Sequence, residues 1–128
     1  MPVTIRRVYR RGNSLTFTLP GKWAVPEVLY VYVNENYLVY SQVRGLENEF
    51  RVKYVGKIKR RSVRYWSKGG VYREYYLITI PRGVCHMLGM REGMEVLVIE
   101  ITEYEAKTYL VFTSLRAFED YGKKLVAH

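Results

Sequence analysis

One strand pattern occurs twice in this chain, and it limits the possible folds more than any other feature of the sequence. The segment NSLTFTLP at 13–20 aligns with EYYLITIP at 74–81, so that Phe17 falls on Ile78. In both segments bulky apolar residues occupy alternate positions, and this period of two predicts a strand with one buried face. Each segment ends in proline, which has no N–H to donate and therefore ends a strand ladder. Two equivalent central strands are expected.

Two further matches follow in the same order along the chain. PEVLYVYV at 26–33 aligns with MEVLVIEI at 94–101, and NYLVYSQVR at 36–44 aligns with TYLVFTSLR at 108–116. Three matches in one order predict an internal duplication. Each repeat is expected to form a strand, a tight turn, a second strand ending in proline, a short linker and a final hairpin.

The duplication sets the expected domain organisation and fold class. The first repeat spans 1–48 and the second spans 49–128, and together they are expected to form one compact unit. In the second repeat, apolar residues at helical spacing within 82–93 predict a short helix that ends at Gly89. A short amphipathic helix is expected in the tail after residue 114. Alternating hydrophobic residues and regular turns dominate the rest, so the chain is predicted to be mostly β.

The positive charge of the chain is large and unevenly distributed. Among 128 residues, 21 lysines and arginines stand against 12 acids, which gives a formal net charge of +9. Residues 1–22 contain no acid, residues 51–75 contain nine basic residues and only Glu74, and seven of the acids lie from Glu92 onward. A solvated surface usually mixes its signs, so this segregation favours a polyanionic partner such as nucleic acid.

Several functional classes receive no support from the residues. Cys85 is the only cysteine, so an intramolecular disulfide is impossible and a reducing, cytoplasmic location is expected. No apolar run approaches the roughly 20 residues that span a bilayer, and no signal-peptide core is present. Cys85 and His86 are adjacent and have neither an orienting partner nor ligand spacing, which disfavours a catalytic dyad or a zinc site. We therefore expect no enzymatic activity, no cofactor, no membrane partner and no small-molecule substrate.

The segment RRGNSLTFTLPGKW at 10–23 resembles the start of the AbrB/MazE/SpoVT swapped-hairpin family. ITIPRGVCHMLGMREGMEVLV at 78–98 is similar to the remainder of that signature, with Met94 where aspartate is usual. Members of this family bind DNA as transcriptional regulators or antitoxins, normally as homodimers whose interleaved hairpins form a small barrel. The resemblance implies that two tandem units build such a swapped-hairpin barrel here, either as a pseudo-dimer within one chain or as a homodimer of chains.

The candidate DNA-binding residues come from the resemblance and from the distribution of charge. The resemblance carries contacts over to Tyr9, Arg10, Asn13, Ser14 and Thr18. Charge adds Arg6, Arg7 and Arg11 in the first repeat, and Lys59, Arg60, Arg61, Arg64, Lys68 and Arg73 in the second. Asn13 is expected to adopt a positive φ beside Gly12, to contact a base or phosphate, or to do both. The tips of both hairpins are expected to project from one side and to meet DNA phosphates there.

The expected function is that of a transcriptional regulator, associated with the nucleoid, that binds double-stranded DNA and selects for sequence or shape. Two alternatives stay open: an antitoxin-like module whose partner is a protein, and an RNA or single-stranded nucleic-acid binder that stacks bases on tyrosines. The basic run at 57–64 also fits an edge strand that resists aggregation, and Arg10 and Arg11 also fit an ordinary charged strand face. Four tyrosines are expected to fill the core instead: Tyr30, Tyr37, Tyr76 and Tyr109.

Overall fold

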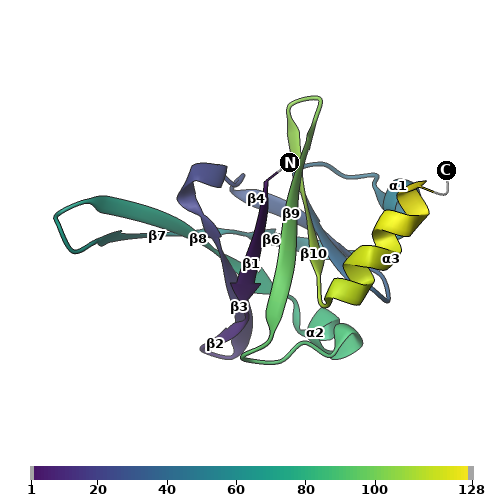
Figure 1. The fold of residues 1–128 in the computed structure, drawn as a ribbon, viewed down its shortest axis with the longest axis horizontal. Helices are drawn as coiled ribbons and strands as arrows, with labels where there is room; N and C mark the ends of the chain where they lie inside the picture. The colour runs from purple at the N-terminus through teal and green to yellow at the C-terminus, as the bar shows by residue number, and fades with distance from the viewer. Residues whose placement is uncertain (1, 127–128) are drawn as a thin grey trace.

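The alternating sequence pattern folds into ten strands in two antiparallel sheets, so the prediction of a mostly β chain is confirmed for the part that the structure describes (Figure 1). The structure is a computed structural model that describes residues 2–126. A six-stranded sheet has the order β1-β9-β10-β5-β4-β6, and a four-stranded sheet has the order β2-β3-β8-β7. The strands are β1 (Val3–Arg7), β2 (Tyr9–Arg11), β3 (Ser14–Pro20), β4 (Val28–Val33), β5 (Tyr37–Ser41), β6 (Lys53–Lys59), β7 (Arg61–Trp66), β8 (Tyr72–Ile80), β9 (Glu95–Glu103) and β10 (Ala106–Phe112).

The six-stranded sheet is the middle layer of the molecule, because both of its faces are covered. Leu38 faces the four-stranded sheet and belongs to the hydrophobic core between the two sheets. On the opposite face, Phe112 packs against Phe118 with ring centroids 5.5 Å apart. This face lies beneath α1 (Glu47–Phe50) and α3 (Leu115–Val126), which Figure 1 shows on the side away from β2 and β3. Sheet on sheet and helix on sheet thus bury two separate apolar clusters.

β3 and β8 form the centre of the four-stranded sheet, as their shared pattern predicted. Their antiparallel register sets Phe17 opposite Ile78, and both side chains are fully buried. β3 ends at Pro20 and β8 ends immediately before Pro81. Each strand then leads into a short helical linker: the 3-10 turn η1 (Gly21–Trp23) and the helix α2 (Arg82–Leu88).

The predicted helices are confirmed, and one further helix was missed. α2 is followed by Gly89, whose φ of 63° is typical of the left-handed residue that ends a helix. The turn η1 is followed in the same way by Ala24, with a φ of 47°. α3 forms the predicted helical tail. α1 spans only four residues, which is too short for a helical period to show in the sequence.

The strand order is unchanged when the two repeats are exchanged. β1 pairs with β9 and β6 pairs with β4, so the first strand of each repeat joins the final hairpin of the other. The pairs β5–β10 and β3–β8 join equivalent strands across an approximate two-fold axis. Both sheets therefore contain strands from 1–48 and from 49–128, and the two repeats are interleaved.

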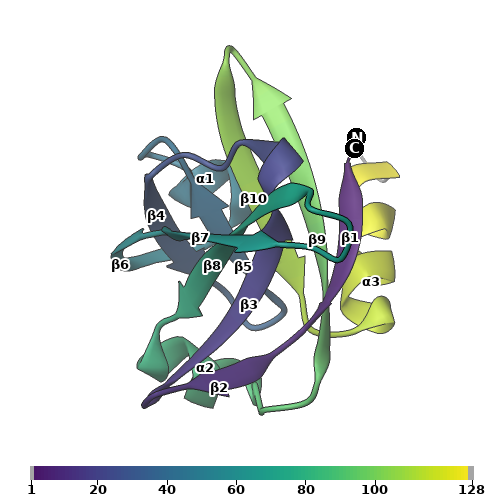
Figure 2. The same ribbon diagram turned by 90° about the vertical axis from the view of Figure 1, so that its left-hand side faces the viewer.

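Two bent segments connect the sheets, but the sheets do not form a closed barrel. β1 and β2 are separated only by Val8, and β6 and β7 only by Arg60. The N–H of Val8 donates to the Met94 carbonyl at 2.7 Å, and that of Arg60 donates to the Glu27 carbonyl at 2.9 Å. Figure 2 shows β1 leading into β2 along one curved ribbon. Because the bends interrupt the strand ladders, neither sheet closes on itself within residues 2–126, and the expected swapped-hairpin barrel is not confirmed.

The second and third sequence matches are out of register in the structure. Leu29 lies in the core between the sheets, whereas its match Leu97 packs on the helical side of the six-stranded sheet. Leu38 and its match Leu110 are separated in the same way. Both faces of this sheet are buried, so apolar residues occupy both sets of alternate positions along a strand. The sequence therefore cannot reveal a shift of one residue. Of the three matches, the one at 13–20 keeps its side chains on equivalent faces.

Candidate nucleic-acid interface

The outward face of the four-stranded sheet carries many of the candidate residues. The inward face is defined by Leu15, Phe17 and Leu19, so the residues between them on β3 point away from the core. Strand register extends this outward face across the sheet to Tyr9, Arg11, Ser14, Thr16, Thr18, Arg61, Val63, Tyr65, Arg73, Tyr75, Leu77 and Thr79. The members of the predicted DNA-binding set on this face are Tyr9, Arg11, Ser14, Thr18, Arg61 and Arg73.

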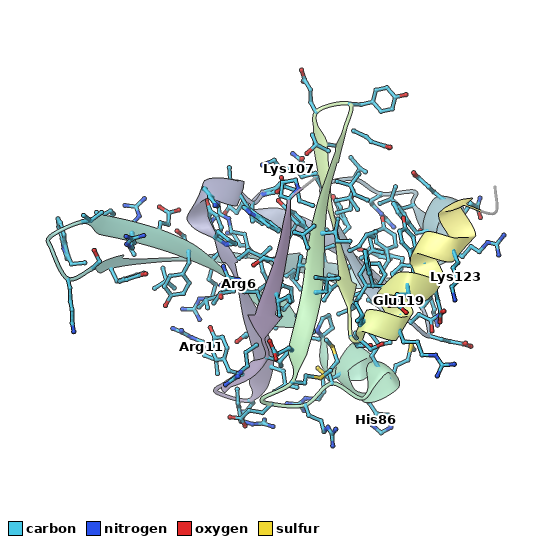
Figure 3. The ribbon with its side chains drawn as sticks, in the orientation of Figure 1. Arg6, Arg11, His86, Lys107, Glu119 and Lys123 are labelled. Atoms are coloured by element: carbon cyan, nitrogen blue, oxygen red, sulfur yellow. The ribbon has the colours of Figure 1, made fainter. Side chains whose placement is uncertain are left out.

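An open depression of about 890 Å³, which we call the basic depression, lies between the β1–β2 segment and the β7–β8 hairpin. Four cationic side chains from three parts of the chain line it: Arg6, Arg11, Lys22 and Arg73. The other lining residues are Tyr9, Thr18, Pro20, Gly21, Tyr65, Glu74 and Tyr75. Figure 3 shows Arg6 and Arg11 on the side of the molecule from which the β7–β8 hairpin projects. Lys22 was not among the predicted contacts.

The cations of the basic depression have no acidic partner within residues 2–126. The ion pairs in this part of the chain involve Arg10, Lys59, Arg64 and Lys107 instead. Glu74 is the one acid that lines the depression, but its carboxylate pairs with Arg64 at 3.4 Å and accepts a hydrogen bond from Ser62 at 3.0 Å. The depression therefore keeps a net positive charge, which attracts an anionic ligand.

Close packing at Gly21 fixes the shape of the basic depression. A Cβ atom at residue 21 would lie only 2.4 Å from the carbonyl oxygen of Glu74. The linker after β3 therefore contacts the β7–β8 hairpin only because residue 21 has no side chain. This contact joins two of the three chain segments that supply the cations.

A second, smaller depression of about 370 Å³ lies at the other end of the β3–β8 pair. Its Thr79 and Pro81 are the repeat equivalents of Thr18 and Pro20 in the basic depression. Arg10 and Arg82 line it together with Asn13, Ser14, Leu15, Ile80 and Cys85, and no acid is among the lining residues. Arg82 was not predicted as a contact. Burial raises the pKa of the Cys85 thiol, so the sulfur stays protonated at neutral pH.

Two predicted contacts have internal partners at the bend between β6 and β7. The Nε of Arg60 donates to the carbonyl of Val25 at 3.0 Å, and its guanidinium lies 4.7 Å from the ring centroid of Tyr76. Lys59 pairs with Glu27 at 3.1 Å. These contacts give Arg60 a structural role that the charge of the segment did not reveal, because it depends on residues distant in the sequence.

The remaining predicted cations also lie outside the basic depression. Arg10 is on the inward side of β2, where it pairs with Glu92 at 3.6 Å. Arg64 pairs with Glu74 on the same side of the β7–β8 hairpin. Arg7 on β1 and Lys68 in the turn before β8 are exposed and line neither depression.

The two hairpin tips lie at opposite ends of the β3–β8 pair, so the expectation that they project from one side is wrong. The tip at 12–13 precedes β3 and the tip at 67–71 precedes β8. Because β3 and β8 are antiparallel, each tip lies beyond a different end of the pair, and Figure 1 shows them far apart. At the first tip Gly12 adopts the positive φ of 62°, and Asn13 does not. Both hairpins nevertheless contribute residues to the outward face of the four-stranded sheet.

Two further observations limit the chemistry of this part of the chain. No group of three or more His, Cys, Asp or Glu side chains in residues 2–126 could hold a metal ion. No helix there is both long enough and apolar enough to cross a membrane. Comparisons of the chain with protein-family models, curated proteins and solved structures find no match.

Proposed function

We propose that this chain binds double-stranded DNA as a transcriptional regulator, and that the outward face of the four-stranded sheet meets the DNA. The basic depression carries this proposal, because its four cations have no acidic partner in the described residues and its single acid is already paired. The Nε of Arg6 supports an anionic ligand there, since it is buried without a hydrogen-bond partner in residues 2–126. A buried donor that lacks an acceptor costs free energy, and a shift of the Arg6 side chain toward a phosphate oxygen in the depression would satisfy it.

The polar and charged side chains divide into two roles on this surface. Arg11, Lys22 and Arg73 supply phosphate contacts, which give affinity and fix the orientation of the duplex. The amide of Asn13 and the hydroxyls of Ser14 and Thr18 offer donors and acceptors that suit base edges or sugar oxygens. The smaller depression repeats part of this arrangement across the two-fold axis, and a second stretch of DNA backbone would meet Arg82 there and compete with Glu92 for Arg10.

The interleaved pairing supports a relation to the AbrB/MazE/SpoVT family. We propose that the exchange of first strands between the two repeats is the single-chain counterpart of the swapped hairpins of that family's dimers. The curved segments at Val8 and Arg60 would correspond to the corners of the family's small barrel. A DNA-binding role of this kind implies a cytoplasmic, nucleoid-associated protein.

Four tyrosines are unavailable for stacking on single-stranded nucleic acid. Tyr37, Tyr76 and Tyr109 are buried and Tyr30 is half-buried, so these rings cannot stack on unpaired bases. A binder of single strands uses aromatic platforms along its groove. Tyr9, Tyr65 and Tyr75 line the basic depression beside its cations, so the comparison of duplex and single-strand probes decides between the two ligands.

The test is fluorescence anisotropy with a labelled duplex and with one of its single strands, over a salt series from about 50 to 200 mM. About five phosphate contacts predict a log–log salt slope of about −4.5. The double variant Arg11→Ala/Arg73→Ala is expected to bind the duplex about tenfold or more weakly and to lower the slope by about two. Both residues are exposed, so the thermal midpoint is expected to stay unchanged.

The matched control removes the same charge from the opposite side of the molecule. Arg116 and Lys123 are exposed on α3, and Figure 3 shows Lys123 far from Arg6 and Arg11. Arg116→Ala/Lys123→Ala is expected to weaken binding by less than about threefold, because only the net charge changes. Equal losses in the two double variants, or no duplex binding by the wild type at low salt, would overturn the proposal.

A further inference from the structure

The far part of the β7–β8 hairpin extends beyond the four-stranded sheet. β3 pairs with β8 only as far as Tyr75, whereas β7 pairs with β8 out to Trp66 and Tyr72. Residues 64–74 therefore form a free two-stranded ribbon, which we call the arm and which Figure 1 shows projecting far from the rest of the chain. A two-stranded ribbon has little stability of its own in water, so the need for a stable fold does not explain its presence.

The tip of the arm exposes large apolar side chains to solvent. Trp66 is 71% exposed, Val71 53% and Tyr72 50%. The rings of Trp66 and Tyr72 form a T-shaped pair with centroids 5.1 Å apart. The N–H and Oγ of Ser67 both donate to the carbonyl of Val71, at 2.9 and 3.0 Å, and thereby close the turn. The apolar group is thus held in a defined shape while it lies in water, as expected of a contact surface.

Positive charge surrounds this apolar tip. Lys68 lies in the turn itself, Arg64 lies on the same face of the ribbon as the aromatic pair, and Arg73 lies on the opposite face. The one acid of the arm, Glu74, is paired with Arg64. A complementary partner must therefore be anionic and must also offer flat apolar surfaces. Nucleic acid combines both properties, in its phosphates and its stacked bases.

We propose that the arm enters a groove of the bound duplex and inserts Trp66 against the base stack, so that the DNA bends at that step. This inference rests on the proposed function. A two-stranded ribbon fits the major groove, and apolar side chains that part adjacent base pairs bend the duplex. Tyr65 and Arg73 line the basic depression from one face of the arm, and Trp66 and Tyr72 lie on its other face, so a ribbon inside a groove presents both sets to the DNA. A duplex bound in the depression therefore meets the base of the arm, and its groove lies within reach of the tip.

The test compares three single variants for duplex binding over the same salt series. Trp66→Ala is expected to lower affinity about tenfold by the same factor at every salt concentration, because base stacking releases no counterions. Trp66→Phe keeps an aromatic ring and is expected to retain most of the affinity. Tyr104→Ala is the control, since Tyr104 is fully exposed in the turn between β9 and β10 and is expected to leave affinity unchanged.

Two spectroscopic readouts separate insertion from a general effect on binding. Trp23 is only 6% exposed, so a change in tryptophan emission on adding duplex reports on Trp66 and is expected to disappear in Trp66→Phe. Energy transfer between dyes at the two ends of the duplex measures bending, and Trp66→Ala is expected to leave the bound duplex straight. Trp66 and Tyr104 are both exposed, so the thermal midpoints of the three variants should match that of the wild type.

The possible outcomes distinguish this inference from the proposed function. If the wild type binds duplex with a steep salt dependence but Trp66→Ala binds equally well and bends it equally, the inference about the arm is wrong and the proposed function stands. If the wild type does not bind duplex at low salt, both are wrong. If Trp66 emission changes with protein concentration in the absence of DNA, and sedimentation gives a larger mass, a second copy of the chain occupies the tip and the inference is overturned.

Discussion

The β2–β3 and β7–β8 hairpins occupy equivalent places in the strand order, yet they present different chemistry. The first closes on a short polar turn at 12–13, and the second continues as the arm and exposes Trp66 and Tyr72. Their central strands, in contrast, are equivalent in register and in burial. The comparison teaches that the two repeats share a core and differ in their ribbons. Differences in function between the repeats are therefore expected in the ribbons.

The largest effect is expected at Gly21, where the linkers that follow the two hairpins differ. Gly21→Ala would force a Cβ to 2.4 Å from the Glu74 carbonyl oxygen, so the linker and β8 would have to separate. We expect the free energy of unfolding to fall by about 2–3 kcal/mol in urea denaturation. Gly83→Ala in α2 is the control, since a Cβ there meets no atom within 4 Å and alanine favours the helix. Equal stability of the two variants would mean that the linkers are interchangeable.

A turn transplant tests whether the arm alone makes the two hairpins functionally different. Val63 pairs with Tyr75, the repeat equivalent of Ser14, as Arg11 pairs with Ser14, so residues 64–74 can be replaced by the Gly-Asn turn of the first hairpin. Duplex affinity is expected to fall about tenfold or more. The thermal midpoint is expected to change by only a few degrees, because the removed residues lie beyond β3. Anisotropy and thermal unfolding provide the two measurements.

Arg73 is lost with the arm, so Arg73→Ala alone is the matched control for the transplant. Arg73→Ala is expected to account for only part of the lost duplex affinity, because the transplant also removes the charge of Lys68 and the stacking of Trp66. If the transplanted protein fails to fold, the arm is a structural element and the comparison of the two ribbons no longer holds.

The smallest effect concerns the core, where the repeats should respond alike. Tyr40 and Tyr109 both lie buried between the sheets, and burial raises the pKa of both hydroxyls, with the charge of Glu100 adding to the rise at Tyr109. An unfolded tyrosine ionises near pH 10, so stability is fully present below that pH and is lost as the pH rises above it. Relative to the wild type, Tyr40→Phe and Tyr109→Phe should each gain about 1.4 kcal/mol between about pH 9 and about pH 11.

Urea unfolding at the two pH values provides the measurement. Tyr104→Phe changes a fully exposed residue and supplies the control, for which no such gain is expected. A gain in only one of the two core variants would mean that the hydroxyl of the other tyrosine ionises in the folded state.

The elements that the sequence predicted well have one buried face or a clear end. β3 alternates apolar and hydroxyl residues, β3 and β8 both stop at prolines, and α2 ends before Gly89. The register within the six-stranded sheet could not be predicted, because a strand buried on both faces has no polar alternation to fix it. The division into two open sheets depends on bends at Val8 and Arg60, and neither residue type is a strand breaker.

The candidate site was predicted only where charge and strand alternation agree. Arg11 and Arg73 lie on the outward face as part of one surface, but charge alone could not distinguish them from Arg60, which lies over the ring of Tyr76. Lys22 and Arg82 were missed. Lys22 and Arg82 each lie one or two residues after the proline at the end of a central strand. This shared position is the signal that would have identified them.

A homodimer with a two-fold axis carries every substitution twice, once in each half. Here one polypeptide encodes both halves of the interleaved fold, so each ribbon can change alone, and the halves meet without a bimolecular step that depends on protein concentration. A palindromic operator mirrors a symmetric protein. Under the proposed function, two unlike ribbons call for two unlike half-sites, and such a site has a direction: reversing it would present each ribbon with the half that suits the other.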